Sequence, residues 1–195
     1  MNIVIVQYNA GNIQSVLYAL QRIGATGVVT NDAHAISSAD KVIFPGVGEA
    51  SSAMQYLQQQ GLDKVIKNLQ QPTLGICLGM QLMCTHSEEN NTNCLNIFDT
   101  PVKKFESNAL KVPQVGWNTI EPNNNILFNN ITTNSYCYFV HSYYASICNN
   151  TIATTNYILP FSSALKKDNF YGVQFHPEKS AAIGEQILTN FLNLT

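Results

Sequence analysis

Residues 73–81, TLGICLGMQ, place a single cysteine between two glycines. The apolar run before Cys77 is typical of a buried strand, and the residues after it have the spacing of a helix. At such a strand-to-helix elbow the central residue is held in a strained, exposed conformation, and the residues two before and two after it must be small. Gly75 and Gly79 satisfy this condition. The stretch therefore predicts a nucleophilic Cys77 on an α/β fold; a buried cysteine between two packing glycines is the alternative.

The chain on either side of this elbow predicts two kinds of sheet. In the first half, strands expected at 2–6, 26–30, 41–44 and 73–76 alternate with helices expected at 13–23, 50–60, 62–69 and 78–84. In the second half, strands expected at 111–120, 136–146, 151–157 and 170–175 have no helices between them, and a helix is expected at 183–194. We therefore expect an α/β fold with a doubly wound, mostly parallel sheet, flanking helices and an added antiparallel section in the second half, in one domain over residues 1–195.

Composition argues against several classes of protein. The 195 residues are 45 % hydrophobic and 11 % charged, with a formal net charge of -2, so neither disorder nor nucleic-acid binding through bulk charge is expected. No apolar run reaches the roughly 20 residues of a membrane helix, and the apolar start at 3–6 indicates a strand rather than a signal peptide. The five cysteines include no Cys-x-x-Cys pair, which argues against disulfides and a zinc site. We expect a reducing, cytoplasmic location.

A nucleophilic cysteine needs a base, and His176 is the best placed of the histidines. The start of the helix beside Cys77 favours thiolate over thiol, and the amide of Leu78 points where a tetrahedral oxyanion would form. Pro177 biases His176 to an extended conformation, in which residues two apart lean to the same side. Glu178 can then hold one ring nitrogen of His176 while the other faces Cys77. This gives a nucleophile, a base and an orienting acid in the order Cys, His, Glu.

A second donor for the oxyanion is expected in the turn Pro45-Gly46-Val47-Gly48. This turn follows the strand expected at 41–44, which should lie beside the strand that carries Cys77. Glycines let a backbone N–H approach a substrate carbonyl closely. An ordinary strand-to-helix turn is the alternative for this stretch taken alone.

These motifs together resemble a known family. The segments PGVG at 45–48, GICLGMQL at 75–82 and QFHPE at 174–178 are similar to the class I glutamine amidotransferase domain, and the similarity covers nearly the whole chain. Three further segments, YNAGNIQSV at 8–16, VPQVGWN at 112–118 and YFVHSYYA at 138–145, resemble the glutaminase subunits of imidazole glycerol phosphate synthase within that family.

The resemblance implies that Cys77, His176 and Glu178 hydrolyse glutamine to glutamate through a glutamyl thioester. It also implies that Val47, Gly48 and Leu78 donate to the oxyanion and that Gln81, Ser142 and Tyr143 contact glutamine. The positions implied to face the partner or to gate activity are Asn12, Tyr138 and His141. The ammonia would pass to a (β/α)₈-barrel cyclase subunit in a heterodimer. Together the subunits would make imidazole glycerol phosphate and an aminoimidazole carboxamide ribotide. No cofactor, metal, nucleic acid or membrane is implied.

Two places depart from the pattern of these glutaminase subunits, Asn9 in the first turn and Gln114-Val115 before the Gly-Trp-Asn segment. Three other interpretations stay open. One is an amidotransferase subunit of a chorismate-using synthase, against which the Gly-Trp-Asn segment and Asn12 count. The others are a stand-alone cysteine hydrolase and a non-catalytic scaffold, although the scaffold interpretation does not explain why the whole triad is present. The peptide around Val47, flanked by glycines, is the expected gate of activity.

Overall fold

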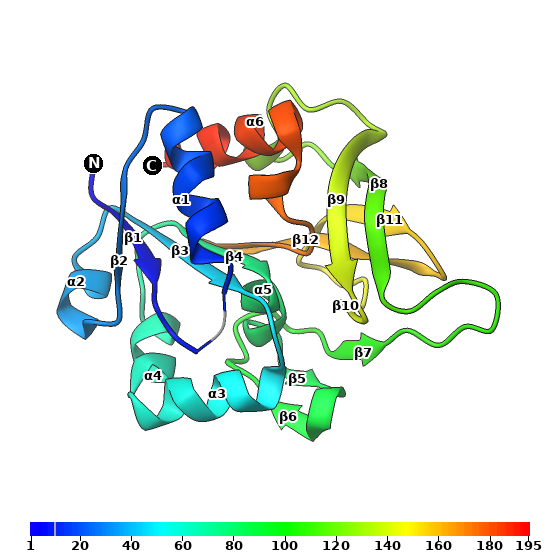
Figure 1. Cartoon of the computed structure of the whole chain (residues 1–195), viewed down its shortest axis with the longest axis horizontal. Coiled ribbons are helices and arrows are strands. Elements are labelled where there is room, and N and C mark those ends of the chain that lie inside the picture. The colour runs from blue at the N-terminus through cyan, green and yellow to red at the C-terminus, as the bar shows by residue number, and fades with distance from the viewer. Residues whose placement is uncertain (10) are drawn as a thin grey trace.

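A computed structural model describes residues 1–9 and 11–195; Ala10, in the turn expected after the first strand, lies outside the described residues. At its centre is a parallel sheet with the strand order β2-β1-β3-β4-β13 (Figure 1). The bounds of these strands are β1 (Ile3–Val6), β2 (Gly27–Thr30), β3 (Lys41–Gly46), β4 (Thr73–Cys77) and β13 (Phe170–Val173). Because all neighbouring pairs in this series are parallel, the doubly wound core expected from the sequence is confirmed.

Helices cover both faces of this sheet (Figure 1). Helices α1 (Ile13–Arg22) and α6 (Ala181–Leu192) lie on one face; α2 (Ala33–Ser37), α3 (Ala50–Gln59), α4 (Leu62–Lys67) and α5 (Leu78–Leu82) lie toward the other. Successive side chains of a strand point to opposite faces. In β1, Ile3 and Ile5 therefore belong to the core shared with α1 and α6, while Val4 and Val6 belong to the core shared with α3 to α5. Burial on both faces explains why these strands are apolar throughout.

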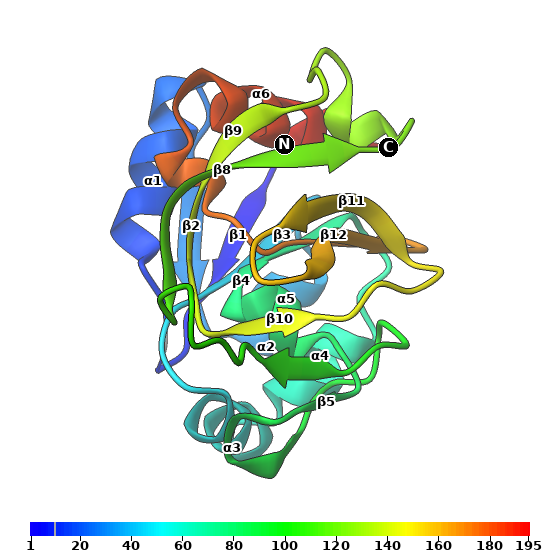
Figure 2. The same ribbon diagram turned by 90° about the vertical axis from the view of Figure 1, so that its right-hand side faces the viewer.

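The second half of the chain adds antiparallel strands beyond β13. Strand β12 (Pro160–Lys167) pairs with β13, and β10 (Tyr143–Ala145) and β7 (Val102–Lys104) continue outward from it. Strand β11 (Thr151–Asn156) joins β12 to β8 (Gln114–Pro122), which pairs with β9 (Ser135–His141). Figure 2 shows β8 and β9 side by side, with α6 next to β9. The expected antiparallel section is confirmed.

The remaining short elements are β5 (His86–Ser87), β6 (Thr92–Asn93) and the 3-10 segments Glu89–Asn91, Ile126–Phe128 and Pro177–Lys179. Several details differ from the sequence expectations. Helix α2 and strand β7 were not expected. The single strand expected at 136–146 is split at Ser142 into β9 and β10, and β12 was not expected. The helix after Cys77 ends at Leu82 rather than at residue 84, because the chain turns there and Thr85 donates to the carbonyl of Thr100.

The register of the parallel strands assembles the candidate site. Gly46 at the end of β3 lies opposite Cys77 at the end of β4, and Val173 of β13 lies opposite Ile76. The turn after β3, the elbow after β4 and the segment after β13 therefore meet at the carboxyl edge of the sheet. Ligands of open α/β sheets bind at this edge. Because β13 is the neighbour of β4, the segment that carries His176 is brought beside Cys77 despite the distance between them in sequence.

Candidate active site

The backbone at Cys77 has the elbow conformation that the sequence predicts. Cys77 has φ 53° and ψ -108°, a region that residues with a side chain rarely occupy, between β4 and α5. A Cβ atom on Gly79 would lie 1.8 Å from the carbonyl oxygen of Phe44, and one on Gly75 would lie 2.8 Å from the amide nitrogen of Met80. Both positions therefore require glycine, and the tight packing holds the cysteine in its strained conformation.

His176 and Glu178 form a buried pair behind the cavity. The Nδ1 atom of His176 lies 2.8 Å from Oε1 of Glu178, and the two residues are only 2 % and 6 % exposed. The backbone N–H of His176 donates to the carbonyl of Tyr138 at 2.8 Å, which fixes the start of the Pro177–Lys179 turn. Since Nδ1 is engaged by Glu178, the free ring nitrogen of His176 is Nε2, the atom available to exchange a proton.

The charges around His176 favour its protonated form. Burial alone lowers the pKa of His176, but the Cys77 sulfur and the Glu178 carboxylate outweigh it and raise that pKa to about 10. An imidazolium between a sulfur and a carboxylate is stabilised by both neighbours. The arrangement therefore suits an ion pair of a cysteine thiolate with a protonated histidine.

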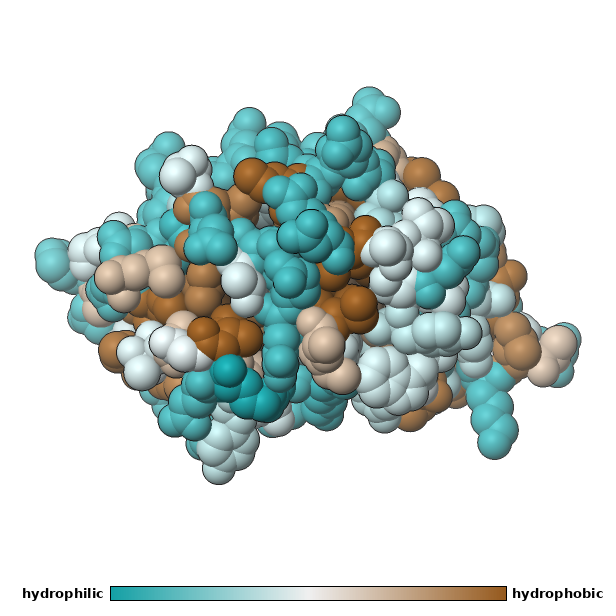
Figure 3. Space-filling view, turned by 90° about the horizontal axis from the view of Figure 1, so that it is seen from above, coloured by the Kyte–Doolittle hydropathy of each residue, from teal (hydrophilic) through white to brown (hydrophobic). Residues whose placement is uncertain are grey.

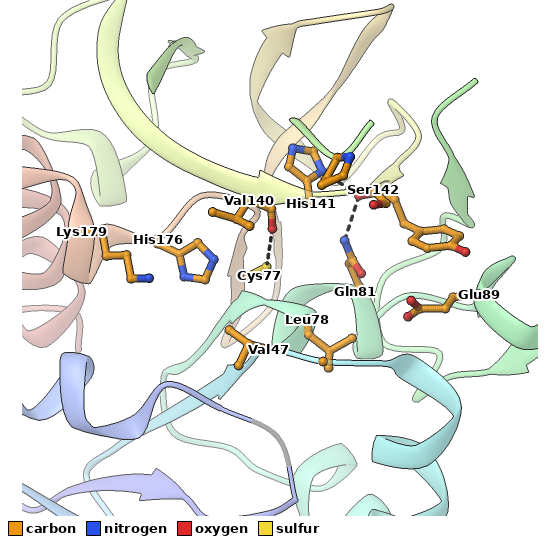
Figure 4. A pocket seen from close by; sticks show the side chains of 13 residues that line it. Val47, Cys77, Leu78, Gln81, Glu89, Val140, His141, Ser142, His176 and Lys179 are labelled. Atoms are coloured by element: carbon orange, nitrogen blue, oxygen red, sulfur yellow. Dashed lines mark hydrogen bonds between the residues drawn. The ribbon is translucent and has the colours of Figure 1, made fainter. Parts of the chain in front are cut away.

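Cys77 and His176 line one cavity at the carboxyl edge of the sheet (Figure 4). The sulfur of Cys77 has two further contacts there. It lies 3.8 Å from the carbonyl oxygen of Val140, to which a thiol donates, and 3.6 Å from Nε2 of Gln174, from which it accepts. The nucleophile candidate is thus enclosed by polar groups and open to the cavity.

The turn proposed as the second oxyanion donor borders the same cavity. Val47 and Gly48 line it together with Leu78, the first residue of α5. Gly48 has φ 117°, which favours glycine, and Val47 is 40 % exposed. A Cβ atom on Gly46 would lie 2.2 Å from the hydroxyl oxygen of Tyr8, so that position also requires glycine. The structure brings the three predicted oxyanion residues together, and their role remains a prediction.

The three predicted glutamine contacts also converge on this cavity. Gln81, Ser142 and Tyr143 all line it. The Nε2 atom of Gln81 donates to the carbonyl oxygen of Tyr143 and to Oε1 of Gln174, each at 2.9 Å. Because both N–H groups of Gln81 are used within the protein, its side-chain oxygen is the atom free to accept from a ligand.

Sequence reasoning missed three residues at this site. Glu89, from the polar loop at 88–96, lines the cavity, and its Oε2 accepts from the backbone N–H of Ala50 at 2.7 Å. Lys179 also lines the cavity, and Gln174 lies buried behind the sulfur of Cys77. The two adjacent acids Glu88 and Glu89 in an Asn-rich loop were the available signal for Glu89. For Gln174 and Lys179 the signal was proximity to His176 in the sequence.

The predicted partner-facing residues lie in three different environments. Asn12 is the half-buried residue that precedes α1, and its carbonyl accepts from Val16. Tyr138 is half-buried on the outer face of β9, edge-on to Trp117 with ring centroids 5.8 Å apart. His141 is 5 % exposed and lies on the inner face, where Phe105, Phe139 and Phe161 surround its ring. Asn12 and Tyr138 are thus both partly exposed, whereas His141 is buried.

His141 is held neutral by its surroundings. Burial lowers its pKa to about 4, although its hydrogen bond to the carbonyl of Tyr143 acts in the opposite direction. Its Nδ1 donates to that carbonyl at 2.7 Å, so Nε2 of the neutral ring is an acceptor. The side chain of Gln114, 3.0 Å from Nε2, then has to present its NH₂ group to the ring. Gln114, one of the residues at which the sequence departs from the family pattern, thereby supplies the hydrogen-bond donor that Nε2 of His141 needs.

Within residues 1–9 and 11–195, no three His, Cys, Asp or Glu side chains are placed to share a metal ion. Across the same described residues, no helix is long and apolar enough to cross a membrane.

Comparison with known proteins identifies the group to which this fold and site belong. The family described as "Glutamine amidotransferase class-I" matches residues 4–194. The chain belongs to the class I glutamine amidotransferase family. Solved structures resemble it as well: PurLQS from Thermotoga maritima has a TM-score of 0.74 at 15 % identity, covering 98 % of this chain and 97 % of that one. A glutamine amidotransferase from the same organism has a TM-score of 0.64 at 14 % identity, covering 99 % and 83 %. These two likenesses show the fold.

Sequence relatives place this amidotransferase more narrowly. It is 58 % identical to the imidazole glycerol phosphate synthase subunit HisH of Bacteroides thetaiotaomicron, over 100 % of both chains. The HisH subunit of Pectobacterium atrosepticum is 50 % identical, again over 100 % of both chains. Within the class I amidotransferases, the chain therefore belongs with the HisH subunits, as the segments noted in its sequence suggest.

Proposed function

We propose that this chain is the glutaminase subunit of an imidazole glycerol phosphate synthase in histidine biosynthesis. In this proposal it hydrolyses glutamine to glutamate and passes the ammonia to a (β/α)₈-barrel cyclase subunit with which it forms a heterodimer. The observation that carries the proposal is the meeting of Cys77, His176 and Glu178 at one cavity, in a chain 58 % identical to a HisH subunit.

The chemistry begins with proton transfer. The Cys77 thiol gives its proton to Nε2 of His176, and the thiolate attacks the side-chain amide carbon of glutamine. The N–H groups of Leu78 and of the Gly46-Val47-Gly48 turn stabilise the oxyanion. The C–N bond then breaks, and His176 returns the proton to the departing ammonia. Water next attacks the glutamyl thioester with His176 as the base, which releases glutamate and restores the thiol.

The ends of the cavity suit the two ends of glutamine. In this proposal the amide end of glutamine binds at Cys77 and its α-ammonium group at the carboxylate of Glu89. Both side chains line the same cavity and lie apart from each other in it (Figure 4). Burial raises the pKa of Glu89, partly offset by the hydrogen bond from the N–H of Ala50, and a bound ammonium would favour its charged form. Gln81 offers its free side-chain oxygen, and Ser142 and Tyr143 line the wall between.

The outer face of the β8–β9 hairpin supports the proposed heterodimer. Across the hairpin, Val115 pairs with Val140 and Trp117 with Tyr138. Val115, Trp117 and Val140 are 60 %, 52 % and 37 % exposed. The face of the molecule seen in Figure 3 carries hydrophobic residues in groups among hydrophilic ones. A row of exposed aromatic and branched side chains is typical of a protein interface. One member of this row, Val140 on β9, also has its carbonyl oxygen beside the sulfur of Cys77.

The proposed location is the cytoplasm. The five cysteines are all free, two of them partly exposed, which suits a reducing compartment.

Glutamate release by the purified chain tests the proposal. We would measure it for the chain alone, then with a cyclase partner of the HisF type together with a nucleotide ligand of that partner, and with Cys77→Ala as the control. We expect the partner to stimulate the reaction and Cys77→Ala to lower it about 10⁴-fold, because the nucleophile is lost. Retention of one tenth of the rate by the variant would exclude Cys77 as the nucleophile.

The other outcomes separate the alternatives. High activity without a partner would indicate a stand-alone hydrolase. Stimulation by a chorismate-using synthase, and not by the cyclase, would indicate the other amidotransferase group. If the chain has no activity under any of these conditions, the interpretation as a non-catalytic scaffold is the one that remains.

A further inference from the structure

A buried glutamine, Gln174, joins the cysteine to the cavity wall. It follows β13 directly, and its backbone N–H donates to the carbonyl of Ser163 at 2.9 Å. The side chain is fully buried. Its Nε2 donates to the sulfur of Cys77 at 3.6 Å, and its Oε1 accepts from Nε2 of Gln81 at 2.9 Å. Both ends of the amide are therefore engaged, one with the sulfur and one with a residue that lines the cavity.

The orientation of this amide is determined by a backbone atom. The carbonyl oxygen of Tyr143 can only accept, so the atom of Gln81 that lies 2.9 Å from it has to be the nitrogen. The same nitrogen lies 2.9 Å from the side chain of Gln174, so the facing atom of Gln174 has to be its oxygen. The NH₂ group of Gln174 is then the end that faces Cys77. The chain of hydrogen bonds leaves Gln174 no alternative orientation.

The contacts of the Cys77 sulfur respond differently to the loss of its proton. The thiol can donate to the carbonyl of Val140, 3.8 Å away, whereas a thiolate has no proton to give and faces the negative end of that carbonyl. The N–H of Gln174 is a donor to both forms, and a hydrogen bond to an ionised acceptor is the stronger one. Gln174 thus favours the thiolate, and Val140 favours the thiol.

We infer that Gln174 is a catalytic residue that stabilises the Cys77 thiolate by hydrogen bonding and, through Gln81, ties the nucleophile to the wall that receives the substrate. The inference rests on the proposed function for its consequence in turnover. Gln174 forms no covalent bond and takes up no proton; the proton of Cys77 still passes to His176. Its part is to supply an N–H where negative charge develops on sulfur.

Several titratable groups also influence the negative charge on the Cys77 sulfur. The titratable side chains around the sulfur are Tyr8 and His176, with Glu89, His141 and Lys179 lining the same cavity. Glu178 acts on the sulfur through His176. An uncharged substitution at Gln174 leaves all of these in place, so a change in thiolate formation in Gln174→Met can be assigned to the lost N–H.

Alkylation of Cys77 tests the inference without glutamine or a partner. The rate of reaction with iodoacetamide would be followed from pH 4 to 10 on the full chain, by mass spectrometry of the peptide that contains Cys77, since only the thiolate reacts. Gln174→Met keeps the approximate length without an N–H donor. Gln174→Glu keeps an acceptor for Gln81 and places a carboxylate toward the sulfur. We expect the rate at pH 7 to fall at least fivefold in the first variant and at least tenfold in the second, with the pH midpoint moved upward in both.

A matched control is Gln186→Glu, since Gln186 donates to Asn190 within α6, away from the cavity. Its alkylation profile should equal that of the unmodified chain. If both Gln174 variants fold and also keep that profile, the inference is overturned. If neither folds, the side-chain ¹⁵N resonance of Gln174 in the unmodified chain still tests it. That resonance should titrate with the same midpoint as the alkylation of Cys77, and a resonance that does not change over this range would overturn it.

Glutamine turnover with the cyclase partner then distinguishes the hydrogen bond of Gln174 to Cys77 from its hydrogen bond to Gln81. Gln174→Glu retains the acceptor for Gln81, so kcat should fall while KM changes little. Gln174→Met loses both links, so KM should rise as well. Because alkylation needs no glutamine, a failure of the proposed glutaminase function would leave the alkylation result intact, and the two failures can be told apart.

Discussion

Strands β4 and β9 both reach the sulfur of Cys77, but their surroundings differ. Every residue of β4 is buried, and the cysteine is its last residue. Strand β9 alternates, with Cys137, Phe139 and His141 buried and Tyr136 and Val140 exposed. The parallel strand is held by neighbours on both faces and both edges, whereas one face of β9 is open to another molecule. The first strand fixes the position of the nucleophile, and the second connects it to the outside of the protein.

In the proposed function, this difference separates the residues assigned to the reaction from those assigned to partner binding. The triad, the glycine turn and Gln174 all follow strands of the parallel core. The exposed row of Val115, Trp117 and Val140 lies on the antiparallel hairpin. Changes on the core side should therefore affect the rate of hydrolysis, and changes on the outer face of the hairpin should affect stimulation by the partner.

The largest effect in this comparison is expected at Glu178. Glu178→Gln removes the buried charge that helps to raise the pKa of His176. We expect the rate of glutamine hydrolysis to fall about 10² to 10³-fold, less than on loss of the nucleophile, because an amide still offers an acceptor to Nδ1. Steady-state assays of glutamate release with the partner present would measure it.

The control for this variant is Glu185→Gln. Glu185 pairs with Arg22 at the surface at 2.7 Å, so its loss removes a carboxylate of the same kind away from the sulfur. The control should stay within about twofold of the unmodified rate. An unchanged rate in Glu178→Gln as well would mean that Glu178 only contributes to packing.

A smaller effect, on stability, is expected from His141 at the boundary between the two regions. Its pKa is lowered to about 4 in the folded chain by burial, against the ordinary value of 6.5. The unfolded chain therefore binds the extra proton first as pH falls, and the folded state loses stability between about pH 6.5 and 4. At pH 4.5 this amounts to about 2 to 3 kcal/mol relative to pH 7.

Denaturant unfolding at the two pH values would measure this loss in the unmodified chain and in His141→Gln. The carboxylates titrate in both proteins, so the difference between them isolates the histidine. His141→Gln should be less stable at pH 7 but should lose less stability on acidification. Equal losses in the two proteins would show that His141 does not titrate as its burial indicates.

The smallest effect is expected on the outer face of the hairpin. Trp117→Ala removes an exposed ring that packs edge-on to Tyr138. We expect about a tenfold weaker affinity for the cyclase partner, with the alkylation rate of Cys77 in the free chain unchanged. Titration calorimetry would measure the affinity. Tyr18→Ala is the matched control, because Tyr18 is a similarly exposed aromatic residue, 54 % against 52 %, on α1. Equal losses in both variants would exclude this face as the docking surface.

Local patterns predicted the parallel half of the fold well. The strands of the core are buried on both faces, so their apolar runs stand out, and Gly75 and Gly79 mark the elbow directly. Strand β12 was missed because two consecutive serines, Ser162 and Ser163, are buried in it. The hydroxyl of Ser162 is satisfied by the carbonyl of Ser146 and by Thr151. Buried serines in place of apolar side chains therefore hid this strand from a search for apolar runs.

The candidate site could likewise be predicted from the sequence only in part. His176 and Glu178 are two residues apart, so their pairing follows from local geometry. Gln174 and Gln81 are joined only through the pairing of β13 with β4, and Glu89 reaches the cavity from a loop whose path the sequence does not specify. Contacts between distant segments depend on the tertiary structure, which no short pattern contains.

Val140 presents two different surfaces to its surroundings. Its side chain is part of the outer face of β9, and its carbonyl oxygen lies 3.8 Å from the sulfur of Cys77. The exposed side chain and the carbonyl oxygen beside the sulfur thus belong to the same residue. A shift of β9 by a fraction of an ångström would alter the electrostatic field at the sulfur without any rearrangement of the core. A probe attached to Cys77 would accordingly report on events at the outside of the hairpin.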